Sequence, residues 1–155
     1  MNLIFLVDPY EKYTTEEKNI FLRIEEENKS FGNFLGYVLE QEHAKGNRIL
    51  IWTNDSHLGV MKQIPKKIYK QFNKKFPKYE MIYVCGFHYG ICVEECARLL
   101  NERYKIPKEK IGIVLNLSIP APEQKVHKIE NFFQSDFQLY YWTNQAFVPI
   151  DLKQV

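Results

Sequence analysis

The segment CGFHYGICVEEC, residues 85 to 96, places reactive side chains beside two glycines. Cys92 stands where a helix would begin, and a thiol there meets backbone N–H donors and the positive end of the helix dipole, which favour the thiolate. His88 could act as the base of a Cys–His pair. Cys92 could equally be a small buried apolar residue, because free cysteine is among the most buried residue types. The remaining thiols, Cys85 and Cys96, are predicted to be buried and inert.

Three further residues carry candidate chemistry. Asp8 directly follows the apolar run LIFLV and is either a turn residue before Pro9 or a general base. Asp55 and His57 form a D-x-H pair that could present two donors to one metal ion. Asp55 is equally suited to cap a helix, so the pair alone does not decide between the two roles.

Short apolar runs rich in branched and aromatic residues predict the strands. Continuous rather than alternating apolar runs are typical of strands that are buried on both faces of a parallel sheet. The predicted strands are LIFLV (3–7), RILIW (48–52), MIYVC (81–85), IGIVL (111–115) and FQLYYW (137–142).

Helical patterns lie between these runs. Thr14 and Glu17 form a capping-box signature, and apolar residues then recur at helical spacing until a stop at Gly46. Three more segments are predicted to be helical: 65–76, where Ile68, Phe72 and Phe76 lie four apart on one face, 92–104 and 123–134.

The alternation of strands and helices indicates the fold class. Such an order is typical of an α/β protein with right-handed crossovers. We predict a single domain, residues 1–155, built as a three-layer α/β/α sandwich around a mainly parallel, Rossmann-like sheet of five or six strands.

Polar and reactive residue types follow several of the predicted strands. Ligands of open α/β sheets bind beyond the carboxyl ends of the strands. The residues at that edge are Asp8, Thr53 to His57, Gly86 to Cys92 and Asn116 to Pro120. The candidate nucleophile, base and metal pair are therefore predicted to converge on one edge of the sheet.

The composition is that of an ordinary globular chain. The 155 residues carry a net charge of +2, which gives no global argument for a nucleic-acid or membrane partner. Three cysteines without a secretory leader fit a reducing compartment, and the apolar start is too short to span a membrane. We expect a soluble cytoplasmic protein.

Seven lysines lie between residues 62 and 78 and raise the question of nucleic-acid binding. The predicted helix 65–76 accounts for Phe72 and Phe76 as its apolar stripe and leaves the lysines on its solvated faces. The sequence contains no G-x-G-x-x-G and no Walker motif. Nucleotide binding therefore lacks its usual motifs, and because a surface helix accounts for the lysines we expect no nucleic-acid partner.

Several segments resemble the isochorismatase-like cysteine hydrolases, the superfamily that includes nicotinamidases. LIFLVDPYEKY is similar to their first strand with its closing aspartate, and GNRILIWTNDSH is similar to their second strand with its Asp-x-His pair. MIYVCGFHYGICVEECARLL is similar to their strand, turn and cysteine-bearing helix. The resemblance covers nearly the whole chain.

The middle of the chain departs from this family pattern. The family's third strand carries its catalytic lysine, yet only 23 residues separate His57 from the run MIYVC. We expect this third strand to be reduced to LGVMK, residues 58–62, or to be absent.

The resemblance implies a catalytic triad. Cys92 would be the nucleophile and Asp8 the base that takes its proton. Lys62 is the first candidate for the third member and Lys66 the second. The backbone N–H groups of His88 and Cys92 would form the oxyanion hole.

The resemblance also implies the surroundings of the triad. Tyr13, Phe87 and Tyr89 would line the substrate pocket. Asp55 and His57 would belong to a divalent metal site, such as a zinc site, although no cofactor is required. Members of the family commonly dimerise, so a homo-oligomer is expected.

The implied activity is cleavage of a C–N bond in a small amide through a thioester intermediate. The alternative is a relative that has lost catalysis and acts as a small-ligand-binding or assembly protein. The shortened middle of the chain favours that alternative.

Overall fold

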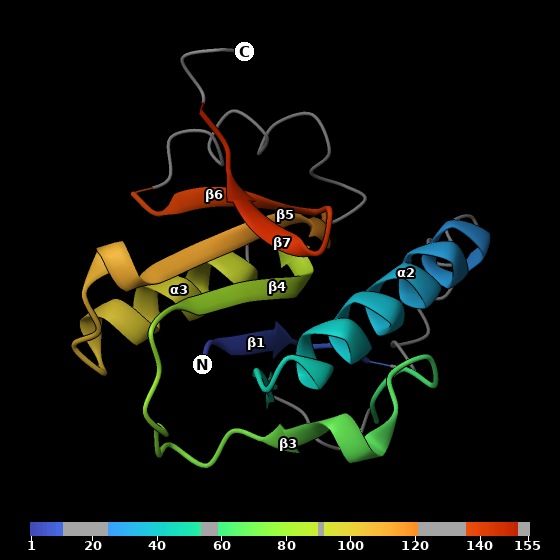
Figure 1. Ribbon diagram of the computed structural model, residues 1–155, viewed down its shortest axis with the longest axis horizontal. Coiled ribbons are helices and arrows are strands. Elements are labelled where there is room, and N and C mark those ends of the chain that lie inside the picture. Colours follow the sequence, from blue (N-terminus) through green and yellow to red (C-terminus); the bar gives the residue numbers. More distant parts are fainter. Residues whose placement is uncertain (11–24, 54–58, 90–91, 121–135, 152–155) are drawn as a thin grey trace.

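The computed structural model describes residues 1–10, 25–53, 59–89, 92–120 and 136–151. These residues form a seven-stranded sheet in the order β3-β2-β1-β4-β5-β6-β7. Figure 1 shows the strands with two helices beside them. The strands are β1 Leu3–Val7, β2 Arg48–Trp52, β3 Tyr69–Gln71, β4 Ile82–Tyr89, β5 Ile111–Pro120, β6 Gln138–Thr143 and β7 Ala146–Pro149; the helices are α2 Glu25–Ala44 and α3 Cys92–Glu102, with 3-10 turns at Lys66–Ile68 (η2) and Lys108–Lys110 (η3).

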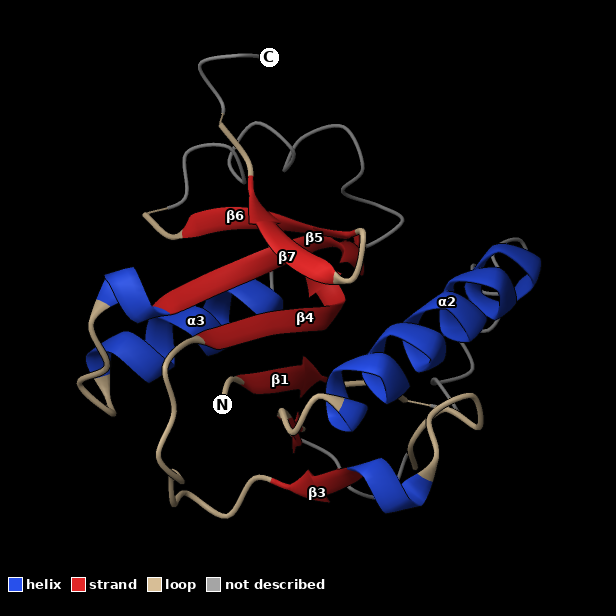
Figure 2. Cartoon of the chain, viewed as in Figure 1, coloured by secondary structure: helices blue, strands red, loops and turns tan. Residues whose placement is uncertain are grey.

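The sheet is parallel from β3 to β6, which confirms the predicted α/β class. It has seven strands rather than the predicted five or six, because two short strands extend its ends: β3 at one edge and β7 at the other (Figure 2). Strand β7 runs antiparallel to β6. Asn144 and Gln145 connect the two strands with φ values of 49° and 65°, the positive φ that a tight two-residue hairpin requires.

Strand β1 is buried along its whole length, and its alternate side chains enter two different apolar clusters. Leu3, Phe5 and Val7 pack in the cluster that contains the buried residues of α3. Ile4 and Leu6 pack in the cluster that contains the buried residues of α2. Because successive side chains of a strand point to opposite faces, α2 and α3 cover opposite faces of β1.

A buried carboxylate joins the end of α2 to β6, which packs in the same apolar cluster. Glu42 is 2% exposed and accepts hydrogen bonds from Asn47 Nδ2 (2.9 Å) and Trp142 Nε1 (3.2 Å). Lys45 Nζ lies 2.6 Å from Glu42 Oε2 and also donates to the Gln145 carbonyl. This carboxylate is therefore paired and hydrogen-bonded, as a buried charge must be.

The predicted helix over residues 65–76 is wrong. The segment forms η2 and β3 and then continues as a loop. Ile68 packs in the cluster of α2, whereas Phe72 and Phe76 pack against the other cluster, with ring centroids 5.0 and 6.2 Å from that of Phe5. The spacing of four residues did not mark one helical face, because the chain passes round the edge of the sheet and contributes to both sides.

The third strand was expected to be reduced to residues 58–62 or absent, and both alternatives are wrong. Of that segment the structure describes residues 59–62, where Val60 forms an isolated bridge with Tyr10, and the third strand is Tyr69–Gln71. Strand β4 continues to Tyr89 instead of ending at Cys85.

The other helix predictions have different outcomes. The segment predicted as helix 92–104 is confirmed as α3, and the long helix is confirmed from Glu25 to Ala44. Its capping box at Thr14 and the predicted helix 123–134 lie outside the described residues. Within the described ranges, no helix is both long enough and apolar enough to cross a membrane.

Two glycines with positive φ allow a matched test of the close approach between β1 and β4 at the centre of the sheet. A Cβ added at Gly86 (φ 118°) would lie 2.4 Å from the Val7 carbonyl oxygen, whereas one at Gly46 (φ 93°) would meet nothing within 4 Å. We expect Gly46→Ala to lower the free energy of unfolding by about 1–2 kcal/mol through backbone strain alone. Gly86→Ala should cost distinctly more, because the central strands must also move apart. Urea unfolding measures both variants, and equal losses would contradict the close approach of β1 and β4.

Candidate functional site

The strand order reverses between β1 and β4. From β1 the chain moves outward through β2 and β3, and it then returns to pair β4 with the opposite side of β1. Val7 at the end of β1 lies beside Gly86 in β4. In open α/β sheets, ligands bind beyond the carboxyl ends of strands at such a switch point. The residues that follow Val7 and β4 therefore define the candidate site.

Asp8 is held in an unusual conformation directly after β1. Its φ is 44°, in the left-handed region that few residues other than glycine adopt, and it is 7% exposed. Its N–H donates to the Trp52 carbonyl at 2.9 Å, and its own carbonyl accepts from the N–H of Tyr10 at 2.8 Å. This tight turn reverses the chain around Pro9 and keeps the carboxylate at the end of the sheet.

A chain of side-chain hydrogen bonds orients the Asp8 carboxylate. The Tyr10 hydroxyl donates to Asp8 Oδ1 at 2.9 Å, and the Thr53 hydroxyl donates to the Tyr10 oxygen at 2.8 Å. Thr53 directly follows β2, so three residues from the ends of two neighbouring strands form one polar chain. Thr53 was predicted at this edge from the sequence, but Tyr10 was not. No local pattern predicts its contact with Asp8, because the contact depends on the positive φ of Asp8.

Cys92 is the first residue of α3 and is only partly buried. It packs against the apolar cluster that contains Val7. As predicted, Cys85 and Cys96 are both fully buried. Cys92 is therefore the most accessible of the three thiols, and it lies at the end of α3 where the helix dipole favours a thiolate.

The pKa of Cys96 is affected by burial, by Asp8 and by the other two thiols. Burial raises the pKa of Cys96 well above its ordinary value, and electrostatic interactions with Asp8, Cys85, Cys92 and Glu95 act in the same direction. Val7, which precedes Asp8, belongs to the apolar cluster against which Cys92 packs. Asp8 and Cys92 therefore both follow segments that contribute to this cluster.

Lys62 and Lys66 are both solvent-exposed. Lys62 lies in a turn that is tied to the Asp8 segment, because the N–H of the preceding Met61 donates to the Pro9 carbonyl at 2.9 Å. Lys66 begins η2, further along the chain. Of the two candidates for the third member of the triad, Lys62 is the one whose backbone adjoins the end of β1.

Phe87 was predicted to line the substrate pocket. It is 2% exposed, and its ring packs edge-on against Phe31 of α2 with centroids 5.6 Å apart. Its ring therefore contributes to the core on the α2 face.

Several predicted site residues lie outside the described part of the chain. They are Tyr13, Asp55 and His57, together with the side chains of His88 and Tyr89, whose backbone belongs to β4. The described residues contain no group of three or more His, Cys, Asp or Glu side chains that could hold a metal ion.

Comparisons of the chain with protein-family models, with curated proteins and with solved structures find no match.

The buried thiol of Cys85 predicts a loss of stability in alkali. Burial raises the pKa of Cys85 to about 12, so the folded state retains a proton that the unfolded chain releases near pH 9. The stabilisation is complete below the unfolded pKa and falls as the pH rises towards the folded value, by up to about 1.4 kcal/mol per pH unit. Cys85→Ala should flatten the fall in unfolding free energy above pH 9, measured by urea titration at several pH values.

Val84→Ala, at the adjacent position of β4, is the matched control. It also creates a cavity in the core but removes no titratable group, so it should lower stability equally at every pH. The same alkaline slope in Cys85→Ala and in the wild type would contradict the role of this thiol.

Proposed function

We propose that the protein is a cysteine hydrolase that cleaves a C–N bond of a small amide, within a three-layer, Rossmann-like α/β/α domain. The observation that carries the proposal is the position of Asp8 and Cys92. They follow the two strands at the switch point of the sheet, and both act on the pKa of Cys96. A carboxylate and an accessible thiol at the ligand-binding edge of this fold support nucleophilic catalysis.

The proposed reaction begins with transfer of the Cys92 thiol proton to Asp8. The thiolate attacks the amide carbonyl carbon, and the backbone N–H groups of His88 and Cys92 stabilise the oxyanion of the tetrahedral intermediate. The C–N bond breaks as the nitrogen takes the proton back from Asp8 and leaves as an amine or ammonia. Water, deprotonated by Asp8, then hydrolyses the thioester, which releases the carboxylic acid and restores the thiol.

The hydrogen-bonded chain from Thr53 through Tyr10 gives Asp8 a fixed orientation for both proton transfers. Tyr10 donates to Oδ1, so one carboxylate oxygen is held in place by the neighbouring turn. General bases must lie within hydrogen-bond reach of the proton that they take, and a locked carboxylate satisfies this need without reorganisation. Lys62 is the proposed third member of the triad, because its segment is bonded to Pro9.

Chemical labelling tests the nucleophile. In native protein treated with iodoacetamide, we expect modification at Cys92 at a pH below about 8.5, where an ordinary thiol reacts slowly. Cys85 and Cys96 are fully buried and should react only after unfolding. Mass spectrometry of digested samples locates the label. Absence of label at Cys92 in native protein, or equal labelling of all three thiols, would overturn the assignment.

Turnover tests the reaction, with benzamide and nicotinamide as probe amides and ammonia release as the readout. Cys92→Ala should abolish release, and Asp8→Asn should slow it by about 10²–10⁴-fold, the usual contribution of a general base. Cys85→Ala is the control, because it removes a buried thiol of the same type from β4. Selective labelling of Cys92 without turnover of either amide would favour the ligand-binding alternative.

A further inference from the structure

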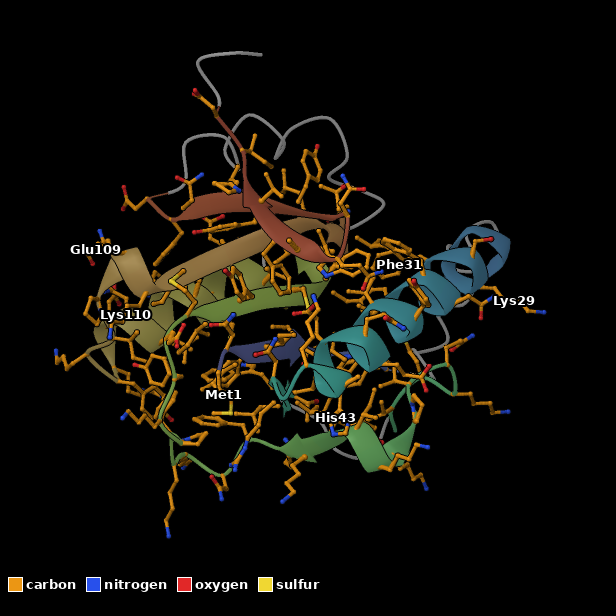
Figure 3. The ribbon with its side chains drawn as sticks, in the orientation of Figure 1. Met1, Lys29, Phe31, His43, Glu109 and Lys110 are labelled. Carbon is orange, nitrogen blue, oxygen red and sulfur yellow. The ribbon has the colours of Figure 1, made fainter. Side chains whose placement is uncertain are left out.

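A groove of about 540 Å³ lies along the β3 edge of the sheet. It includes the first half of β2 and the loop after β3, so it lies away from the carboxyl ends of β1 and β4. In Figure 3, His43 marks the end of α2 that approaches this edge. The volume is within the range of roughly 300–1,000 Å³ typical of ligand-binding pockets. The basic residues of its lining are His43, Arg48, Lys67, Lys70 and Lys75.

Among the residues that the structure describes, no aspartate or glutamate lines this groove. The chain from residue 59 to residue 79 contains seven lysines and neither aspartate nor glutamate. Among the described residues, no ion pair involves Lys67, Lys70, Lys75 or Arg48, and all four are exposed. The groove therefore concentrates positive charge that the described protein does not neutralise.

The lining of the groove also contains two aromatic residues that are only partly buried. Tyr69 packs against the α2 cluster and Phe76 against the cluster of α3, whereas Ile49 and Ile68 are buried. Cationic and aromatic side chains in one lining fit a ligand that combines flat apolar groups with phosphates. Proteins that bind single-stranded nucleic acid combine these two features.

We propose that this groove binds single-stranded nucleic acid through its phosphate backbone. The positive charge continues beyond the groove at Lys66, Lys74 and Lys78, all exposed, so it matches a chain of phosphates better than one compact anion. A single strand can turn its bases towards Tyr69 and Phe76, whereas a duplex keeps them stacked inside. An acidic peptide added to the sheet edge would find only the three residues of β3 to pair with.

The lysines were expected to have no ligand because a predicted helix over residues 65–76 placed them on its solvated faces. The structure has no such helix, so this reason no longer applies. On a helix, the lysines would be distributed around the faces that the apolar stripe leaves free. In the structure, Lys67, Lys70 and Lys75 instead line one groove together with Arg48 from a neighbouring strand. Residues from two segments that are separate in the sequence thus contribute charge to one site.

Salt-dependent binding of a fluorescent twelve-residue oligothymidylate to the full chain tests the proposal. Fluorescence anisotropy between roughly 50 and 200 mM salt should show an affinity that falls steeply as counterions are released. The triple variant Lys67→Gln, Lys70→Gln, Lys75→Gln removes up to three phosphate contacts. We expect it to reduce the slope of log affinity against log salt by about 2, because each contact to a single strand contributes about 0.7.

The matched control is the triple variant Lys29→Gln, Lys105→Gln, Lys108→Gln, which removes the same charge from exposed positions outside the groove. It should bind as the wild type does, and thermal unfolding of both variants shows that the fold is retained. Equal weakening by the two variants would overturn the groove as the site. Absence of binding at low salt, or displacement by polyglutamate as effective as displacement by unlabelled oligothymidylate, would overturn nucleic acid as the ligand.

Discussion

The contact between β1 and β4 at Val7 and Gly86 is the constraint on which the candidate site depends. A side chain at position 86 would meet the Val7 carbonyl oxygen, and only glycine combines this approach with a φ of 118°. The pairing of β4 with β5 is also irregular between Val84 and Gly86, as is common where a glycine interrupts a strand. Because of this approach, the ends of the two central strands stay adjacent. Asp8 follows one of these strands, and the helix that begins at Cys92 follows the other.

This arrangement gives three thiols three different environments. Cys85 lies inside β4, where its sulfur approaches the Phe5 carbonyl at 3.7 Å, and burial keeps it protonated. Cys96 is on the buried face of α3, where burial and nearby negative charge both oppose ionisation. Cys92 begins the helix with partial exposure, which is the position that favours a thiolate. Backbone placement, and not residue type, therefore separates the candidate nucleophile from two thiols of the same chemistry.

The sequence predicted five of the seven described strands and the two described helices, because continuous apolar runs such as LIFLV are typical of a buried sheet. It failed between residues 58 and 76. Ile68, Phe72 and Phe76 have the spacing of a helical face, but a chain that crosses the edge of a sheet can bury the same residues on two sides. The role of Tyr10 was equally hidden, because it depends on a turn at Asp8 with positive φ. Local sequence patterns predict helices and strands. The contacts between side chains depend on turns such as the one at Asp8, which these patterns do not predict.

The lysines of the β3 edge can also protect this edge strand from pairing with another chain. That role accounts for only part of the positive charge of the groove. Exposed edge strands are often protected by lysine, which discourages pairing with another chain. Lys70 lies within β3 and can serve in this way. Lys67 precedes the strand, Lys75 follows it, and Arg48 belongs to β2, which is paired on both sides. Edge protection does not require cations at these three positions. The proposed single-stranded nucleic acid, which carries negative charge, would account for their convergence on one groove.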